Sequence, residues 1–176
     1  MNGQSDLAAA YLLAARAHAE QRRAGSGEPY ISHPCAVAAL VAATGADTDV
    51  VIAAVLHDVV EDTDISLSAI EDRFGATVAA LVDALTDTQA LSTLPMAERK
   101  AAQSTKIAKA SPGARLVKLA DQTANLHDLV ATGAWTNEKR TTYLAGTEQI
   151  ARACAGVDPT LDAAFREAAD ALRETL

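Results

Sequence analysis

Aromatic side chains and cysteines are scarce in this sequence of 176 residues. Only 3% of the residues are Phe, Trp or Tyr although 49% are hydrophobic, so the core must be built from alanine, leucine and valine. These side chains pack well between closely approaching helices, which favours an all-α fold. The two cysteines, Cys35 and Cys154, are too few for a disulfide framework or a cysteine-rich zinc site. We expect both to be reduced thiols.

Long apolar runs and an excess of positive charge are also missing. No uninterrupted apolar segment approaches the roughly 20 residues that span a bilayer, and the amino terminus has no basic patch followed by an apolar stretch. We therefore expect a cytoplasmic protein without a membrane partner. The 15 basic and 23 acidic residues give a net charge of −8, which would repel nucleic acid. We expect no nucleic-acid partner.

Helix start and stop signals recur along the chain, and no convincing strand is found. We expect loops at the glycine-containing segment 25–27, the extended segment 29–33 and the polar segment 88–95. The length is that of one domain, residues 1–176, and a second enzyme domain does not fit. The predicted helices cover residues 5–23, 34–45, 50 to beyond 57, 67–74, 77–87, 96–109, 114–130, 137–155 and 159–176.

The last of these segments is amphipathic. Its apolar residues are Leu161, Ala164, Phe165, Ala168 and Leu172, at helical spacing. Such a face could pack on its own domain or on a second copy of the chain in a homo-oligomer. Packing on its own domain is the simpler interpretation.

The candidate chemistry is concentrated where a buried helix becomes polar. His57, Asp58, Glu61 and Asp62 follow a run of seven apolar residues. His57 and Glu61 are four residues apart, as are Asp58 and Asp62. On a helix the two pairs therefore form neighbouring rows on one surface. Burying carboxylates there is costly unless a cation compensates their charge, and a divalent ion compensates several at once. An isolated His-Asp pair is more often a solvated helix end, so a metal site needs further ligands.

Two other segments supply side chains that ligate metals. His33 precedes a predicted helix, and Asp121 ends an apolar run. With His57 and Asp58 they would form a mixed nitrogen and oxygen site that suits manganese, iron or zinc better than calcium. We therefore predict one divalent ion held by these four residues.

Seven stretches between about residues 7 and 145 carry a recognisable pattern: they are 17–23, 27–34, 56–63, 74–75, 85–87, 117–121 and 125–126. In this order they resemble the hydrolase domain of the RelA/SpoT alarmone family, within the HD-domain superfamily, and especially its stand-alone small hydrolases of the metazoan SpoT-homologue type. The resemblance implies an all-helical HD-domain bundle without a synthetase domain, and one Mn²⁺ ion on the four ligands above. It also implies hydrolysis of the 3′ diphosphate of guanosine tetra- or pentaphosphate, with release of pyrophosphate.

The resemblance also implies roles for side chains around the ion. Glu61 and Asp62, one turn past the metal pair, would position or deprotonate the attacking water and manage the leaving 3′ oxygen. A charged nucleotide needs cations and polar groups around it. Arg22 and Arg23 could instead be ordinary surface charges, and Tyr143 could instead pack in the core. The candidates for substrate contacts are Arg22, Arg23, Lys118, Asn125 and Tyr143.

Three departures from the family pattern remove positive charge. Ala24, Gln122 and His127 stand where a lysine or arginine is usual. Each lost cation could weaken contacts with a diphosphate by about 1.5 to 3 kcal/mol where the contact is buried. An adenosine alarmone or the 2′-phosphate of NADPH therefore remains an alternative substrate. A nucleotide-binding regulator without turnover and an interaction module with a structural metal are the competing classes.

Overall fold

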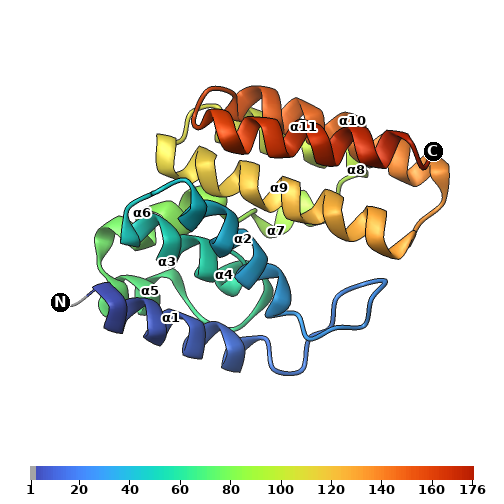
Figure 1. The fold of residues 1–176 in the computed structure, drawn as a ribbon. Helices are drawn as coiled ribbons and strands as arrows, with labels where there is room; N and C mark the ends of the chain where they lie inside the picture. Colours follow the sequence, from blue (N-terminus) through green and yellow to red (C-terminus); the bar gives the residue numbers. More distant parts are fainter. Residues whose placement is uncertain (1–2) are drawn as a thin grey trace.

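A computed structural model describes residues 3–176 as a bundle of α-helices (Figure 1). Within these residues the only extended pairing is an isolated β-bridge between Arg22 and Pro29. The expected all-α fold class is confirmed. In chain order the helices are α1 (Gly3–Ala17), α2 (Ser32–Ala43), α3 (Thr48–Leu56), α4 (Val59–Asp62), α5 (Leu67–Phe74), α6 (Ala76–Leu85), α7 (Gln89–Ser92), α8 (Met96–Ile107), α9 (Pro112–Thr132), α10 (Asn137–Cys154) and α11 (Pro159–Arg173).

Helix α9 joins two groups of helices (Figure 1). It packs against α2, α3 and α6 on one side and against α10 and α11 on the other. The side chain of Ser111 caps its start by accepting a hydrogen bond from the Ala114 amide, with Pro112 in the first turn. Gly133, with a left-handed φ of 59°, ends it. These local signals produce one long helix whose middle lies between the two groups.

The core is aliphatic, as the shortage of aromatics predicted. Helix α3 lies against α1, α2, α6 and α9, and its residues 51–56 are buried on every side. Ala53 and Ala54 are fully buried, and their small side chains let neighbouring helices approach closely. Because α3 is held from all sides, the polar residues that follow it are placed rigidly.

The amphipathic carboxyl-terminal helix packs on its own domain. Helix α11 lies against α9 and α10, and it buries Leu161, Phe165, Ala168 and Leu172. The simpler expectation for this segment is confirmed. No helix in residues 3–176 combines the length and apolar character that crossing a bilayer requires.

The first helix is shorter than predicted. It ends at Ala17, and residues 18–31 form turns in place of the expected helical segment to residue 23. Gln21 explains the change, because its side-chain amide donates to the carbonyl of Asp62 at 2.8 Å and its carbonyl accepts from the Tyr30 amide at 3.0 Å. These partners are distant in sequence, so local helix signals did not reveal them. The two arginines expected at the helix end therefore lie on a loop.

Two smaller differences concern the polar segments. The expected loop 88–95 contains the short helix α7. The predicted continuous helix through His57 is interrupted, because α3 ends one residue before it and α4 begins after Asp58. Both residues keep right-handed helical dihedral angles, and the Asp62 amide still donates to the Asp58 carbonyl at 2.9 Å. The chain thus bends at the His-Asp pair while it keeps the spacing that was predicted.

Candidate active site

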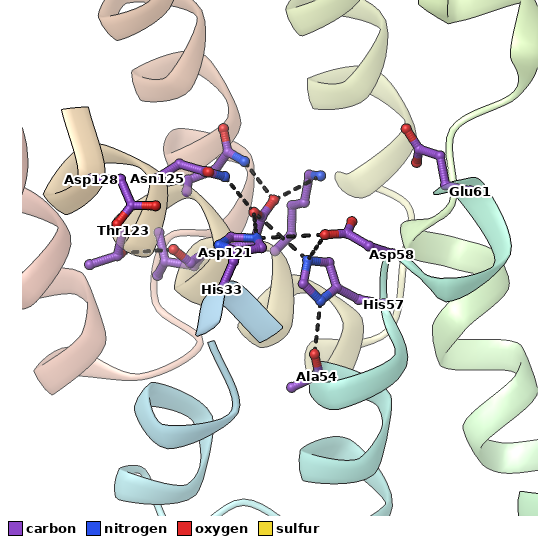
Figure 2. A network of polar contacts seen from close by, with 12 residues as sticks. His33, Ala54, His57, Asp58, Glu61, Asp121, Thr123, Asn125 and Asp128 are labelled. Atoms are coloured by element: carbon purple, nitrogen blue, oxygen red, sulfur yellow. Dashed lines mark hydrogen bonds and ion pairs between the residues drawn. The ribbon is translucent and has the colours of Figure 1, made fainter. Parts of the chain in front are cut away.

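The structure brings together the four side chains predicted as metal ligands (Figure 2). His33 comes from the first turn of α2, His57 and Asp58 from the break between α3 and α4, and Asp121 from the middle of α9. Asp58 Oδ2 lies 3.1 Å from His57 Nε2 and 3.6 Å from His33 Nε2. Asp121 Oδ1 lies 3.3 Å and 3.9 Å from the same two nitrogens. Two imidazoles and two carboxylates therefore face one small volume.

The orientation of His57 suits a metal ion. Its Nδ1 lies 2.8 Å from the carbonyl of Ala54, to which it donates in the tautomer that leaves Nε2 unprotonated. His57 Nε2 is buried and has no hydrogen-bond partner within residues 3–176, although it faces carboxylate oxygens. Burial lowers the pKa of His57, but the charges of Asp58 and Asp121 outweigh burial and raise it to about 9. The site thus favours a positive charge at this position, which a proton or a divalent cation can supply.

Hydrogen bonds also orient the two carboxylates. The hydroxyl of Tyr30 donates to Asp58 Oδ2 at 2.7 Å. Asn125 Nδ2 donates to Asp121 Oδ1 at 2.6 Å, and Lys118 Nζ lies 3.1 Å from Asp121 Oδ2. Burial raises the pKa of Asp121, but the Lys118 ammonium and both imidazoles outweigh burial and hold the pKa well below its usual range. Asp121 is therefore ionised, as a metal ligand must be.

A cavity of about 260 Å³ opens beside these four side chains. It lies where the α2–α4 region faces α8, α9 and α10. Acidic and basic groups share its wall, so it offers both a place for a cation and partners for an anion. The lining residues are Arg23, Tyr30, His33, Asp58, Glu61, Asp62, Asp87, Ser92, Arg99, Lys100, Gln103, Lys118, Asp121, Gln122, Asn125 and Tyr143.

Glu61 and Asp62 line the same cavity, one turn past the metal pair. Glu61 Oε2 accepts a hydrogen bond from the Asp87 amide at 2.8 Å. Partial burial raises the pKa of Glu61 to about 7. The hydrogen bond from the Asp87 amide lowers this pKa but does not outweigh the burial. Burial likewise raises the pKa of Asp62. The raised pKa brings Glu61 close to neutral pH, which is the range that suits a general acid or base.

The two arginines have different positions. Arg23 lines the cavity, where its guanidinium donates to Asn125 Oδ1 at 2.9 Å and pairs with Asp128. Arg22 lies outside the cavity wall, and its guanidinium donates to the carbonyls of Ala19 and Gln21. The structure brings only Arg23 to the wall of the cavity beside the candidate metal ligands, whereas both arginines border an adjoining hollow.

The other predicted substrate contacts lie at the cavity. Lys118 and Asn125 reach it from α9, and Tyr143 from α10. The Tyr143 ring is 8% exposed and packs edge-on against Trp135, with centroids 5.2 Å apart. This tyrosine therefore belongs both to the core and to the cavity wall, and the two interpretations of it are compatible. His127 is exposed and lies outside the cavity wall.

Several residues that line the cavity were not predicted from the sequence. Tyr30 and Asp87 belong to motif segments, so their segments carried a signal although no role was predicted for either side chain. Lys100 and Gln103 carried no signal, because a lysine and a glutamine on an exposed-looking helix are ordinary. Their presence at the site depends on how α8 packs against α9 and α10.

Comparison with known proteins agrees with this geometry. A family model described as an HD domain matches residues 10–150. Guanosine-3′,5′-bis(diphosphate) 3′-pyrophosphohydrolase MESH1 of Homo sapiens is 41% identical over 159 residues, which cover 88% of this chain and 87% of the human protein. The protein of the same name from Drosophila melanogaster is 39% identical over 155 residues, which cover 85% and 84% of the two chains.

A solved structure points to the same group. It is described as a metazoan orthologue of SpoT that hydrolyses ppGpp and plays a role in starvation responses, and it matches with a TM-score of 0.86 at 34% identity. The match covers 97% of this chain and 95% of that one. Fold and site thus define a helical hydrolase of the kind that binds a divalent metal ion. The chain belongs to the HD-domain family and, within it, to the RelA/SpoT-type hydrolases that include the metazoan SpoT homologues.

The family assignment confirms three expectations: the resemblance, the fold class and the enzyme class. The ligand atoms of His33, His57 and Asp58 all lie within 4.8 Å of one another, which makes these residues a possible site for the divalent ion of an HD domain.

Proposed function

We propose that this protein removes the 3′ diphosphate from guanosine tetra- or pentaphosphate as a Mn²⁺-dependent pyrophosphohydrolase. The observation that carries the proposal is the convergence of two imidazoles and two carboxylates beside a cavity lined by both acidic and basic groups. The names of the relatives, guanosine-3′,5′-bis(diphosphate) 3′-pyrophosphohydrolases, support the choice of substrate.

The ion would be held by Nε2 of His33 and His57 and by carboxylate oxygens of Asp58 and Asp121. This donor set matches manganese, iron or zinc, and its two carboxylates favour a harder ion such as Mn²⁺. A divalent ion bound there polarises a phosphoryl oxygen and lowers the pKa of water. The Ala54 carbonyl and the Tyr30 hydroxyl keep two of the ligands in position.

Glu61 is the proposed base for the attacking water. Its pKa of about 7 lets it accept a proton at neutral pH. The Asp87 amide donates to Oε2, so Oε1 would be the oxygen that accepts the proton of the water. Asp62, the next residue, is proposed to manage the proton of the leaving 3′ oxygen. The two steps need separate groups, because one proton is removed from water while another is delivered to the ribose oxygen.

The cations of the cavity are proposed to bind the phosphates. Arg23 is held by Asn125 on α9, and Lys118 adds a second positive charge next to Asp121. Asn125 and Tyr143 also border an adjoining hollow that includes Trp135. We propose that the nucleoside lies toward this hollow while the 3′ diphosphate lies toward the ion.

An activity assay tests the proposal directly. The purified protein with Mn²⁺ should hydrolyse guanosine tetraphosphate and release pyrophosphate, whereas His57→Ala and Asp58→Ala should show no turnover. His127→Ala is the matched control, because this histidine is exposed and lies outside the cavity wall. Wild-type turnover that survives both site substitutions would remove the proposed metal centre.

The same assay should include the adenosine counterpart and NADPH. Because a lysine or arginine is absent at Ala24, Gln122 and His127, these two nucleotides remain the alternative substrates. Faster turnover of either alternative would reassign the substrate while leaving the ion and the carboxylates in their roles. Binding of guanosine tetraphosphate without turnover of any of the three would indicate a regulator instead of an enzyme.

A further inference from the structure

Lys100 on α8 is a buried lysine in the wall of the cavity. It is 4% exposed, its Nζ donates to Gln122 Oε1 at 2.6 Å, and the ammonium lies 4.1 Å from the centroid of the Tyr143 ring. Neither partner carries a negative charge. A buried ammonium is unfavourable unless an anion or several hydrogen bonds compensate its charge. Within residues 3–176 this ammonium thus forms no ion pair, although it lies in the wall of a cavity proposed to bind phosphates.

A glycine makes this position of Lys100 possible. Gly146 on α10 faces the lysine, and a Cβ atom there would lie 2.6 Å from Lys100 Cβ and 2.7 Å from its Cγ. Any larger residue would displace the base of the lysine side chain. The close approach of α8 and α10 thus guides the aliphatic stem of Lys100 past Gly146, so that its ammonium reaches the cavity.

Gln122 connects this lysine to the candidate metal centre. Its Oε1 accepts hydrogen bonds from Lys100 and from Thr147 Oγ1, the latter at 3.3 Å, and its Nε2 donates to Asp121 Oδ2 at 2.7 Å. Gln122 also stands where a basic residue was expected after the aspartate. Position 122 thus lacks a positive charge of its own, but Lys100 on α8 brings one into hydrogen-bond contact with Gln122.

We propose that Lys100 binds the diphosphate group of the substrate and replaces the cation that is absent at position 122. This inference rests on the proposed function, because it requires a substrate with a diphosphate. An ammonium has three N–H donors; within residues 3–176 one is donated to Gln122 and one faces the Tyr143 ring, so a third can reach a phosphate oxygen.

The electrostatics agree with this geometry. Burial and the charge of Lys118 lower the pKa of Lys100 to about 7, against smaller opposing effects of Asp121 and Asp87. Within residues 3–176 no anion is paired directly with this ammonium. A diphosphate in the cavity would supply that anion and hold the lysine in its charged form.

Binding of inorganic pyrophosphate to the full chain in the presence of Mn²⁺ tests the proposal, measured by titration calorimetry. Lys100→Met keeps the apolar stem and removes the charge, and it should weaken pyrophosphate binding about tenfold or more, as expected for a lost charged hydrogen bond. The affinity for Mn²⁺ alone should stay unchanged. Lys109→Met, at an exposed lysine outside the cavity wall, is the matched control and should bind pyrophosphate like the wild type.

Two further variants separate charge placement from folding. The double variant Lys100→Met/Gln122→Lys returns a cation to the wall and should recover most of the lost pyrophosphate affinity. Gly146→Ala displaces the lysine without removing any charged group, and it should weaken pyrophosphate binding less than Lys100→Met. Circular dichroism spectra should confirm that each variant is folded.

Three results would overturn the proposal: no binding of pyrophosphate to the wild type, unchanged affinity in Lys100→Met, or a parallel loss of Mn²⁺ affinity. A parallel loss of Mn²⁺ affinity would mean that Lys100 only helps Gln122 to orient Asp121. The nucleotide assay is independent of this titration. If no nucleotide is hydrolysed but pyrophosphate binding requires Lys100, the proposed function fails and the phosphate-binding role stands.

Discussion

The two walls of the cavity are built in different ways. The metal-side wall consists of His33, His57, Asp58 and Asp121, and bonds from nearby residues such as Ala54 and Tyr30 orient its side chains. The cationic wall, which comprises Arg23, Lys100 and Lys118, combines a loop with two different helices. We infer that the metal-side wall sets the chemistry, while the cationic wall selects the nucleotide. Substitutions in the two walls should therefore change different kinetic parameters.

The largest effect should come from the metal-side wall. His57→Ala removes a proposed metal ligand, whose Nε2 faces Asp58 and Asp121. Losing only a hydrogen-bond partner of a ligand costs up to roughly 100-fold, so this substitution should lower kcat by more than that. Bound Mn²⁺, measured by elemental analysis, should fall in parallel. If His57→Ala kept its Mn²⁺ and its kcat, the metal-side wall would not be the part of the cavity that sets the chemistry.

Glu61→Gln tests the proposed base next to that wall. The substitution should lower kcat roughly 10²- to 10⁴-fold with little change in KM. In the wild type, kcat/KM should rise with pH up to about 7, because the carboxyl accepts a proton only when it is ionised and its pKa is raised to about 7. The variant should lack this rise. An identical pH profile in both proteins would assign the base to another group.

Tyr30→Phe should have an intermediate effect, confined to the metal. It removes the hydroxyl that donates to Asp58 Oδ2 but keeps the ring beside His18 and His33. The affinity for Mn²⁺ should fall roughly 10- to 100-fold, and excess Mn²⁺ should restore turnover. A loss of turnover that saturating Mn²⁺ does not restore would place Tyr30 on the substrate instead.

The cationic wall should show the smallest effect, and it should appear in KM. Arg23→Met should raise KM for guanosine tetraphosphate about tenfold with kcat nearly unchanged, because a charged hydrogen bond to phosphate is lost. Arg73→Met is the matched control, because Arg73 is exposed and lies outside both the cavity wall and the adjoining hollow. Equal effects of the two substitutions would contradict the placement of Arg23 as the phosphate ligand.

Local sequence signals were sufficient for most helices but failed where a distant residue competes. Helix α9 has its own cap, first-turn proline and terminal glycine, so its predicted position was close to the observed one. The end of α1 depends on Gln21, whose partners at Tyr30 and Asp62 were invisible to a local pattern. The same limitation explains why Arg22 and Arg23 were treated as an equivalent pair.

The sequence by itself determined the candidate metal-binding side chains and most of the helices that carry them, because helical spacing and short motifs are local properties. Only the tertiary structure decided that Arg22 lies outside the cavity wall and that Lys100 and Tyr30 belong to it. Lys100 is there because α8 crosses α10 at Gly146, and Tyr30 is there because its loop folds back over α4 through Gln21. Such contacts join residues far apart in the chain, so no local pattern specifies them.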